Sequence, residues 1–100
     1  MTHITRHAMK RTKERTGLSK RASRRNADKA FHEGITHKET SGALNRYITA
    51  LYFEHGTANN VRIYCGMIYI FCDDVLVTVY PLPQKYRRTV ERINAKRGRA

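Results

Sequence analysis

Acidic residues are scarce in this chain. Its 100 residues include only eight Asp and Glu against 20 Lys and Arg, which gives a formal net charge of +12. A net charge of roughly 2 to 8 is enough to keep a small domain soluble, so solubility alone does not account for this surplus. Each Lys or Arg that neutralises a phosphate releases a condensed counterion. The charge therefore predicts a polyanionic partner.

Cysteines and long hydrophobic runs are also few, and their absence excludes several classes of protein. The two cysteines, Cys65 and Cys72, are distant in sequence from the five histidines, which argues against a zinc site. No secretory hydrophobic segment precedes them, so we expect free thiols, buried or half-buried, in a cytoplasmic protein. No apolar run approaches the length of a membrane span, and no basic helix carries a bulky apolar face. The sequence also lacks a glycine-rich phosphate loop and a nucleophile motif, so we expect no metal, cofactor or membrane partner.

The stretch from residue 60 to 80, NVRIYCGMIYIFCDDVLVTVY, is rich in β-branched and aromatic residues. It predicts strands over residues 60–65, 67–72 and 75–80, joined by tight turns at Cys65-Gly66 and Asp73-Asp74. Three such strands form an antiparallel meander. A meander this small is not stable alone. We therefore expect helices to cover one face of the sheet and to leave the other face open.

Four helices are predicted, over residues 2–16, 19–33, 41–55 and 84–96. The first is expected to begin at Thr2 as N-cap and to stop before Gly17. The third has the clearest amphipathic pattern, with apolar residues at Leu44, Tyr47, Ile48, Leu51 and Tyr52. The sequence thus predicts one α+β domain over residues 1–100. Its N-terminal helices pack on a three-stranded antiparallel β-meander, and a C-terminal helix follows.

Basic side chains are arranged in stripes on both N-terminal helices. His3, His7, Arg11 and Arg15 follow one another at four-residue intervals, which places them on one helical face. Such a stripe either donates hydrogen bonds to phosphates or is a solvated basic face. The same two interpretations apply equally to the second helix, whose cations are Lys20, Arg21, Arg24 and Arg25.

Two further groups of residues are functional candidates. Strand alternation places Arg62, Tyr64 and Tyr69 on the open sheet face, where they could align with Thr78, contact phosphate and stack on bases. Alternatively, the tyrosines fill the second layer of the sheet. His37 lies on a predicted loop, and a histidine there can act as general acid or base or can simply be exposed.

The chain resembles two groups of proteins. ITRHAMKRTKERTGL and YIFCDDVLVTVYPLP resemble segments of small phage, prophage and Firmicutes proteins that carry an HAxxRxxxRxGL helix and a similar strand pair. The expected topology is similar to that of RelE-like endoribonuclease toxins. That second resemblance implies metal-independent RNA cleavage, in which a histidine or basic residue activates the 2′-hydroxyl and arginines stabilise the phosphorane. By position, the implied residues are His7, Arg11, Arg15, His37, Arg62 and Thr78.

The sequence therefore predicts a basic nucleic-acid-binding protein of phage or mobile-element type, with RNA favoured over DNA. Three alternatives stay open: an endoribonuclease with His7, His37 and Arg62 as catalytic residues, a binding module without chemistry, and a phage inhibitor of a host nucleoprotein, such as an anti-CRISPR protein. A dimer could form through a sheet edge at 61–64 or 75–80. The expected nucleic-acid contacts are Arg11, Arg15, Lys20, Arg21, Arg24, Arg25, Tyr64, Tyr69, Arg87 and Arg88.

Overall fold

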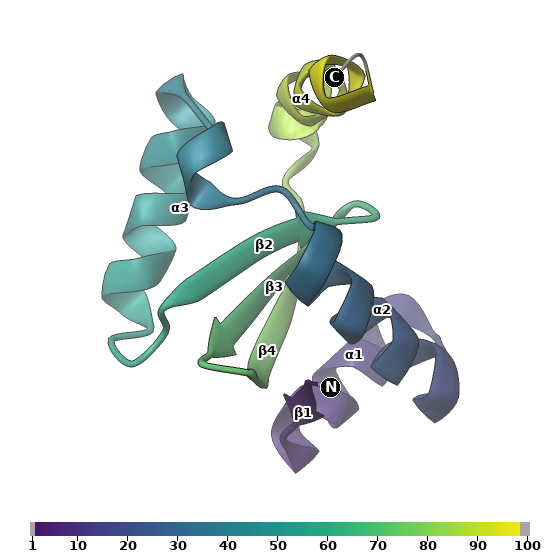
Figure 1. Cartoon of the computed structure of the whole chain (residues 1–100). Helices are drawn as coiled ribbons and strands as arrows, with labels where there is room; N and C mark the ends of the chain where they lie inside the picture. The colour runs from purple at the N-terminus through teal and green to yellow at the C-terminus, as the bar shows by residue number, and fades with distance from the viewer. Residues whose placement is uncertain (1, 99–100) are drawn as a thin grey trace.

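The computed structural model describes residues 2–98, which fold into an α+β domain around a four-stranded sheet (Figure 1). The elements in chain order are β1 (His3–Ile4), α1 (Arg6–Thr16), α2 (Lys20–Glu33), α3 (Gly42–Glu54), β2 (Asn60–Tyr64), β3 (Met67–Cys72), β4 (Val75–Pro81) and α4 (Arg87–Gly98). Short 3-10 helices at His37–Glu39 and Gln84–Tyr86 precede α3 and α4. The strand order is β1-β4-β3-β2. No helix within residues 2–98 has both the length and the apolar character that crossing a membrane requires.

The predicted meander is confirmed, and its two turns have the backbone that the sequence indicated. Cys65 and Gly66 both have positive φ angles, 49° and 73°, as a two-residue hairpin with the right-handed strand twist requires. Asp73 has φ 55° in the second turn, a conformation that Asp adopts more readily than most residues. Strand β2 therefore pairs antiparallel with β3, and β3 with β4.

The N-terminus differs from the prediction, because the first residues form a strand rather than the start of the helix. The Thr5 hydroxyl accepts a hydrogen bond from the Ala8 N–H at 3.0 Å, so Thr5 and not Thr2 is the N-cap of α1. The chain before this cap is free to pair in parallel with β4 as β1. Thr2 instead donates from its N–H and its hydroxyl to the Asp28 carboxylate, at 2.8 and 2.6 Å. These hydrogen bonds hold the pKa of Asp28 below its ordinary value.

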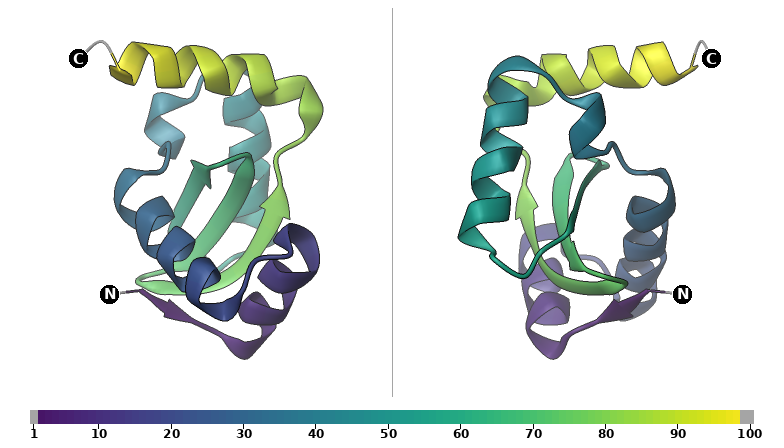
Figure 2. Two further views of the ribbon diagram at one scale, coloured as in Figure 1. Left: turned by 90° about the vertical axis from the view of Figure 1, so that its right-hand side faces the viewer. Right: turned by 60° about the vertical axis from the view of Figure 1, so that its left-hand side comes forward.

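Both faces of the sheet are covered, so the expectation of an open face is wrong. One face packs against α1 and α2 through a cluster formed by Ala8, Ala27, Ala30, Tyr69, Phe71, Leu76 and Val79. The other face packs against α3 and α4 through Leu44, Ile48, Leu51, Val61, Ile63, Ile68, Ile70 and Val90, among others. Figure 2 shows the sheet between α3 and the α1–α2 pair, with α4 lying across one end of the molecule. The physical reason is that β3 is apolar on both sides, so each side requires a helical cover.

A β-bulge interrupts the strand alternation in β4. The register changes from Ile70↔Thr78 to Phe71↔Leu76, which leaves Val77 as the extra residue. Leu76 and Val79 therefore share the face toward α1 and α2. Thr78 pairs with Ile70 and belongs to the opposite face from Arg62 and Tyr69, so the expected alignment of Thr78 with these residues is wrong.

The two sheet edges are already bonded within the chain. On the outer side of β2, the Ile35 N–H donates to the Ile63 carbonyl at 2.8 Å, and the Ile63 N–H donates to the Ile35 carbonyl at 3.1 Å. The Val61 N–H donates to the Tyr52 hydroxyl at 2.9 Å. On the other side, β1 pairs with β4 at Val75 and Leu76. The edge at β2 is thus used by Ile35 and Tyr52, and the edge at β4 is paired with β1 only at Val75 and Leu76, so the edge dimer stays a prediction.

Candidate nucleic-acid interface

The basic residues of α1 and α2 are brought together by a short connection between the helices. Gly17 adopts φ 69° and donates its N–H to the Lys13 carbonyl, which ends α1. Ser19 accepts from the Ala22 N–H at 3.2 Å and begins α2. Each helix carries five Lys and Arg residues, against three carboxylates in total. Half of the chain's 20 basic residues therefore belong to one helical pair, which lies on one face of the sheet (Figure 2).

A groove between the two helices has a distinctly basic lining. Its volume is about 480 Å³, and its lining residues are Ile4, Thr5, Arg6, Met9, Lys10, Lys13, Lys20 and Arg24. Five of these eight side chains are cationic, and the lining contains neither a carboxylate nor an aromatic ring. The start of α2 adds the positive end of its helix dipole, because Lys20 is the first residue of that helix. The groove is therefore suited to phosphate groups and offers no surface for base stacking.

Within residues 2–98, no carboxylate forms an ion pair with a cation of the groove. Within residues 2–98 the ion pairs are His3–Asp74 at 3.8 Å, Arg11–Glu14 at 3.4 Å and Arg97–Glu39 at 3.2 Å. None of them involves a cation that lines the groove. Repulsion between the neighbouring cations of the groove opposes folding. An external anion that binds there would relieve this repulsion.

The predicted histidine and arginine stripe is divided between several roles. His7 is exposed on α1, whereas His3 belongs to β1 and lies near Asp74. The Arg15 guanidinium donates to the Val79 carbonyl and lies 4.8 Å from the centroid of the Tyr80 ring, which ties the end of α1 to β4. Arg11 is paired with Glu14. The stripe therefore contributes partly to packing, and the more continuous cationic row is the neighbouring one on α1.

Sequence periodicity alone did not single out that neighbouring row. Arg6, Lys10 and Lys13 follow the i, i+4, i+7 spacing of a single helical face, so the signal was present in the sequence. The stripe from His3 to Arg15 uses the same periodicity and masked it. Only the packing of Ala8 and Thr12 against the rest of the fold decides which face of α1 is buried and which adjoins α2.

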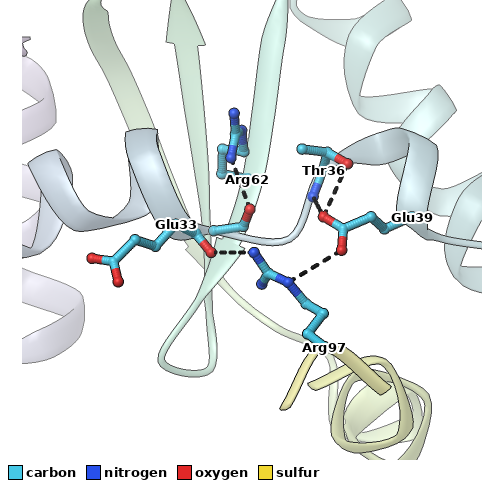
Figure 3. A network of polar contacts seen from close by, with 6 residues as sticks. Glu33, Thr36, Glu39, Arg62 and Arg97 are labelled. Carbon is cyan, nitrogen blue, oxygen red and sulfur yellow. Dashed lines mark hydrogen bonds and ion pairs between the residues drawn. The ribbon is translucent and has the colours of Figure 1, made fainter. Parts of the chain in front are cut away.

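Arg62, one of the predicted catalytic residues, has a structural role, as does Arg97 (Figure 3). Arg62 donates to the Gly34 carbonyl at 2.8 Å and to the Asn60 side-chain oxygen at 2.9 Å. Arg97 donates to the Glu33 carbonyl at 2.8 Å and pairs with Glu39. The two arginines thus fix the end of α2 to β2 and to α4.

Glu39 closes the same network from the other side. Its carboxylate accepts from the Thr36 N–H at 3.0 Å and from the Thr36 hydroxyl at 3.1 Å, in addition to its pairing with Arg97 (Figure 3). The capping box that results begins the 3-10 helix at His37–Glu39. Polar contacts in this region therefore hold the α2–α3 connection in place.

His37, the second predicted catalytic residue, lies apart from His7. Its Nε2 is 2.9 Å from the Thr49 hydroxyl, and its ring lies 5.2 Å from the ring of Tyr52. It lines a recess of about 510 Å³ beside α3, to which neither His7 nor Arg62 contributes. The structure therefore does not bring the three predicted catalytic residues together.

The sheet tyrosines do not form a stacking platform. Tyr69 is only 1% exposed, and burial raises the pKa of its phenol to about 12. Tyr64 is half-buried against the apolar cluster that contains Tyr69, beneath α1 and α2, and burial raises the pKa of its phenol as well. The alternative interpretation, in which these side chains fill the layer beneath the helices, is correct. Arg21 and Arg25 are exposed on α2, and Arg87 and Arg88 are exposed on α4 at the opposite end of the molecule (Figure 2).

Comparisons of the chain with protein-family models, with curated proteins and with solved structures find no match. The resemblances to small phage proteins and to RelE-like toxins therefore stay predictions.

Proposed function

We propose that this protein binds nucleic acid by its sugar-phosphate backbone, through the basic groove between α1 and α2. The observation that carries the proposal is that Arg6, Lys10, Lys13, Lys20 and Arg24 line one groove with no carboxylate among its lining residues. Phosphate contacts supply most of the affinity of non-specific nucleic-acid binding. With no aromatic side chain in the lining, recognition by stacking on unpaired bases is disfavoured.

RNA is the partner that the sequence predicts, and duplex DNA is a second candidate because of the local topology. A helix, a three-residue connection that contains Gly17, and a second helix with Lys20, Arg21, Arg24 and Arg25 in its first two turns form the order seen in DNA-binding helix-turn-helix units. In such units the beginning of the second helix contacts the major groove. Either duplex would present two rows of phosphates to the basic groove.

The deciding experiment is fluorescence anisotropy with matched probes of one sequence and equal length: duplex RNA, duplex DNA and single-stranded RNA. We expect saturable binding to a duplex that is stronger than binding to the single strand. Failure of all three probes to bind at low salt would contradict the proposal. The ratio between the two duplexes separates RNA from DNA, because an A-form and a B-form duplex differ in groove width and phosphate spacing.

The same samples test the endoribonuclease alternative. Because His7 and His37 are on separate elements and Arg62 is bonded to Gly34 and Asn60, we expect RNA to stay intact without added metal. The test is electrophoresis of end-labelled RNA after long incubation with the pure protein. Cleavage that disappears in His7→Ala or His37→Ala would overturn a function limited to binding.

An inhibitor of a host nucleoprotein would use the same cations as a nucleic-acid-binding protein. Capture of a protein partner distinguishes these two functions. Tagged protein is incubated with host lysate that has been treated with nuclease. Recovery of a stable protein partner that Lys10→Glu/Lys13→Glu no longer captures would favour the inhibitor. If direct nucleic-acid binding is the function, nuclease treatment removes the partners.

A further inference from the structure

The outer face of α3 is the largest departure from the basic character of the other helices. The helix buries Leu44, Ile48 and Leu51 against the sheet. On its solvent side it has only two charged residues, Arg46 and Glu54, which are opposite in sign. Phe53 lies on this side as well and is 84% exposed, the only large hydrophobic side chain exposed to that degree within residues 2–98. The core of a protein–protein interface is depleted of charged residues and enriched in aromatic side chains, and this face has that composition.

The two charges of this face are opposite in sign and lie at equal distances along the helix on either side of Ala50. Arg46, Ala50 and Glu54 are each four residues apart, so they form one ridge along the helix, and all three are exposed. The small Ala50 is at the centre, with the cation one turn before it and the carboxylate one turn after it. Neither charge forms an ion pair with the part of the chain that the structure describes. Glu54 is also the last residue of α3, where the helix dipole disfavours a negative charge.

We propose that this face of α3 binds the same face of a second copy of the chain, in an antiparallel pair with its twofold axis at Ala50. A twofold axis there places Arg46 of each copy beside Glu54 of the other, so one ridge forms two identical ion pairs. Ridges of i±4 residues interdigitate when two helices cross at about −50°, and a small central residue allows close approach. A parallel pair would instead oppose Arg46 to Arg46 and Glu54 to Glu54.

The second copy is the occupant that this pattern fits. A polyanion has no reason to bind a face whose two charges cancel, and an acidic protein would meet Arg46 but be repelled by Glu54. Only a partner with the reverse order of charges satisfies both, and the antiparallel copy has this order. Because α3 and the α1–α2 pair cover opposite faces of the sheet, the basic groove stays open in such a dimer (Figure 1).

Charge exchange tests the proposal without nucleic acid. We would purify the protein through high salt, check its ultraviolet absorbance ratio for bound nucleic acid, and measure mass by sedimentation velocity over a concentration series. The wild type should shift from monomer to dimer as concentration rises. Arg46→Glu alone and Glu54→Arg alone each oppose like charges twice, so both variants should be monomers with unchanged circular dichroism. The matched control, Arg88→Glu on α4, should dimerise like the wild type.

The two single variants then serve as partners for each other. In an equimolar mixture, one variant carries carboxylates at both positions of the ridge and the other carries guanidiniums at both. The mixture should therefore recover the dimer, and the double variant Arg46→Glu/Glu54→Arg should dimerise alone. A wild type that stays monomeric over the whole series would overturn the proposal. So would dimers that both single variants retain, or single variants that do not complement each other. None of these results bears on the groove, because binding is measured separately with the probes above.

Discussion

The salt dependence of binding follows directly from the number of cations that line the groove. Each phosphate contact lowers the logarithm of the binding constant by about 0.9 per decade of salt on duplex DNA and by about 0.7 on a single strand. If all five groove cations contact phosphates, the expected slope is about −4.5 on a duplex. Between about 50 and 200 mM salt, affinity should then fall by roughly 500-fold, against roughly 130-fold on a single strand.

Lys10→Ala/Lys13→Ala removes two of the five cations and leaves the helix intact, because both positions are exposed and Ala is the strongest helix former. The slope should flatten to about −2.7, and affinity should fall only roughly 40-fold over the same salt range. The assay is fluorescence anisotropy with a labelled duplex at four or more salt concentrations.

The matched control for this prediction is Arg88→Ala/Arg92→Ala on α4, which removes the same charge from the other end of the molecule. Its slope should equal that of the wild type. The reasoning would be refuted by a wild-type slope near zero. Equal flattening by the two double variants would refute it too, because net charge rather than the groove would then determine binding.

Three further predictions concern the fold. Burial raises the pKa of Tyr69 to about 12, so the unfolded chain loses its phenol proton at lower pH than the folded chain. The free energy of unfolding should therefore be unchanged below about pH 10 and fall by roughly 2 to 3 kcal/mol toward about pH 12. Urea unfolding measures this fall, which should be smaller in Tyr69→Phe. A Cβ at Gly34 would lie 2.5 Å from the Ala30 carbonyl oxygen and 2.8 Å from the Arg62 Cβ, so Gly34→Ala should cost about 1 to 3 kcal/mol, measured as a lower Tm. The buried Ser23 hydroxyl has no hydrogen-bond partner among residues 2–98, so Ser23→Ala should leave thermal stability unchanged or raise it by up to about 1 kcal/mol; a loss would show that the hydroxyl is satisfied.

The elements with local signals were predicted well from the sequence. The strands of the meander are flanked by Cys65-Gly66 and Asp73-Asp74, and these turns have the positive φ angles that such residues permit. The end of α1 at Gly17 and of α2 at Gly34 also followed from single residues. Signals of this kind act within a few residues, so they do not depend on the tertiary fold.

The parts that failed depend on contacts between distant segments. Thr2 and Thr5 are equally good N-caps by type, and the choice between them is made by β4, which pairs with β1, and by the Asp28 carboxylate. The bulge at Val77 moves Thr78 to the other face of the sheet, and an alternating pattern cannot reveal it. The expectation of an open sheet face was wrong because residues of α3 and α4 pack on one side of the sheet and residues of α1 and α2 pack on the other.

The sequence predicted a binding site from the surplus of positive charge, but it did not predict the position of that site in the fold. Lys20 and Arg24 were among the expected contacts, whereas Arg6, Lys10 and Lys13 became candidates only when α1 was seen to adjoin α2. Conversely, Tyr69 was among the expected contacts and is excluded because it is buried. Sequence periodicity gives the angle of a residue around its own helix, but the neighbouring helix decides which angles face a shared groove.

The most direct test of the central claim is a chemical-shift map of the ¹⁵N-labelled protein during titration with an unlabelled duplex. The account predicts that the largest changes in backbone amide shifts fall on α1 and α2, at and around Arg6, Lys10, Lys13, Lys20 and Arg24. Residues of α4 and of the recess at His37 should change little. Shifts confined to α4, or spread evenly over every basic residue, would contradict it.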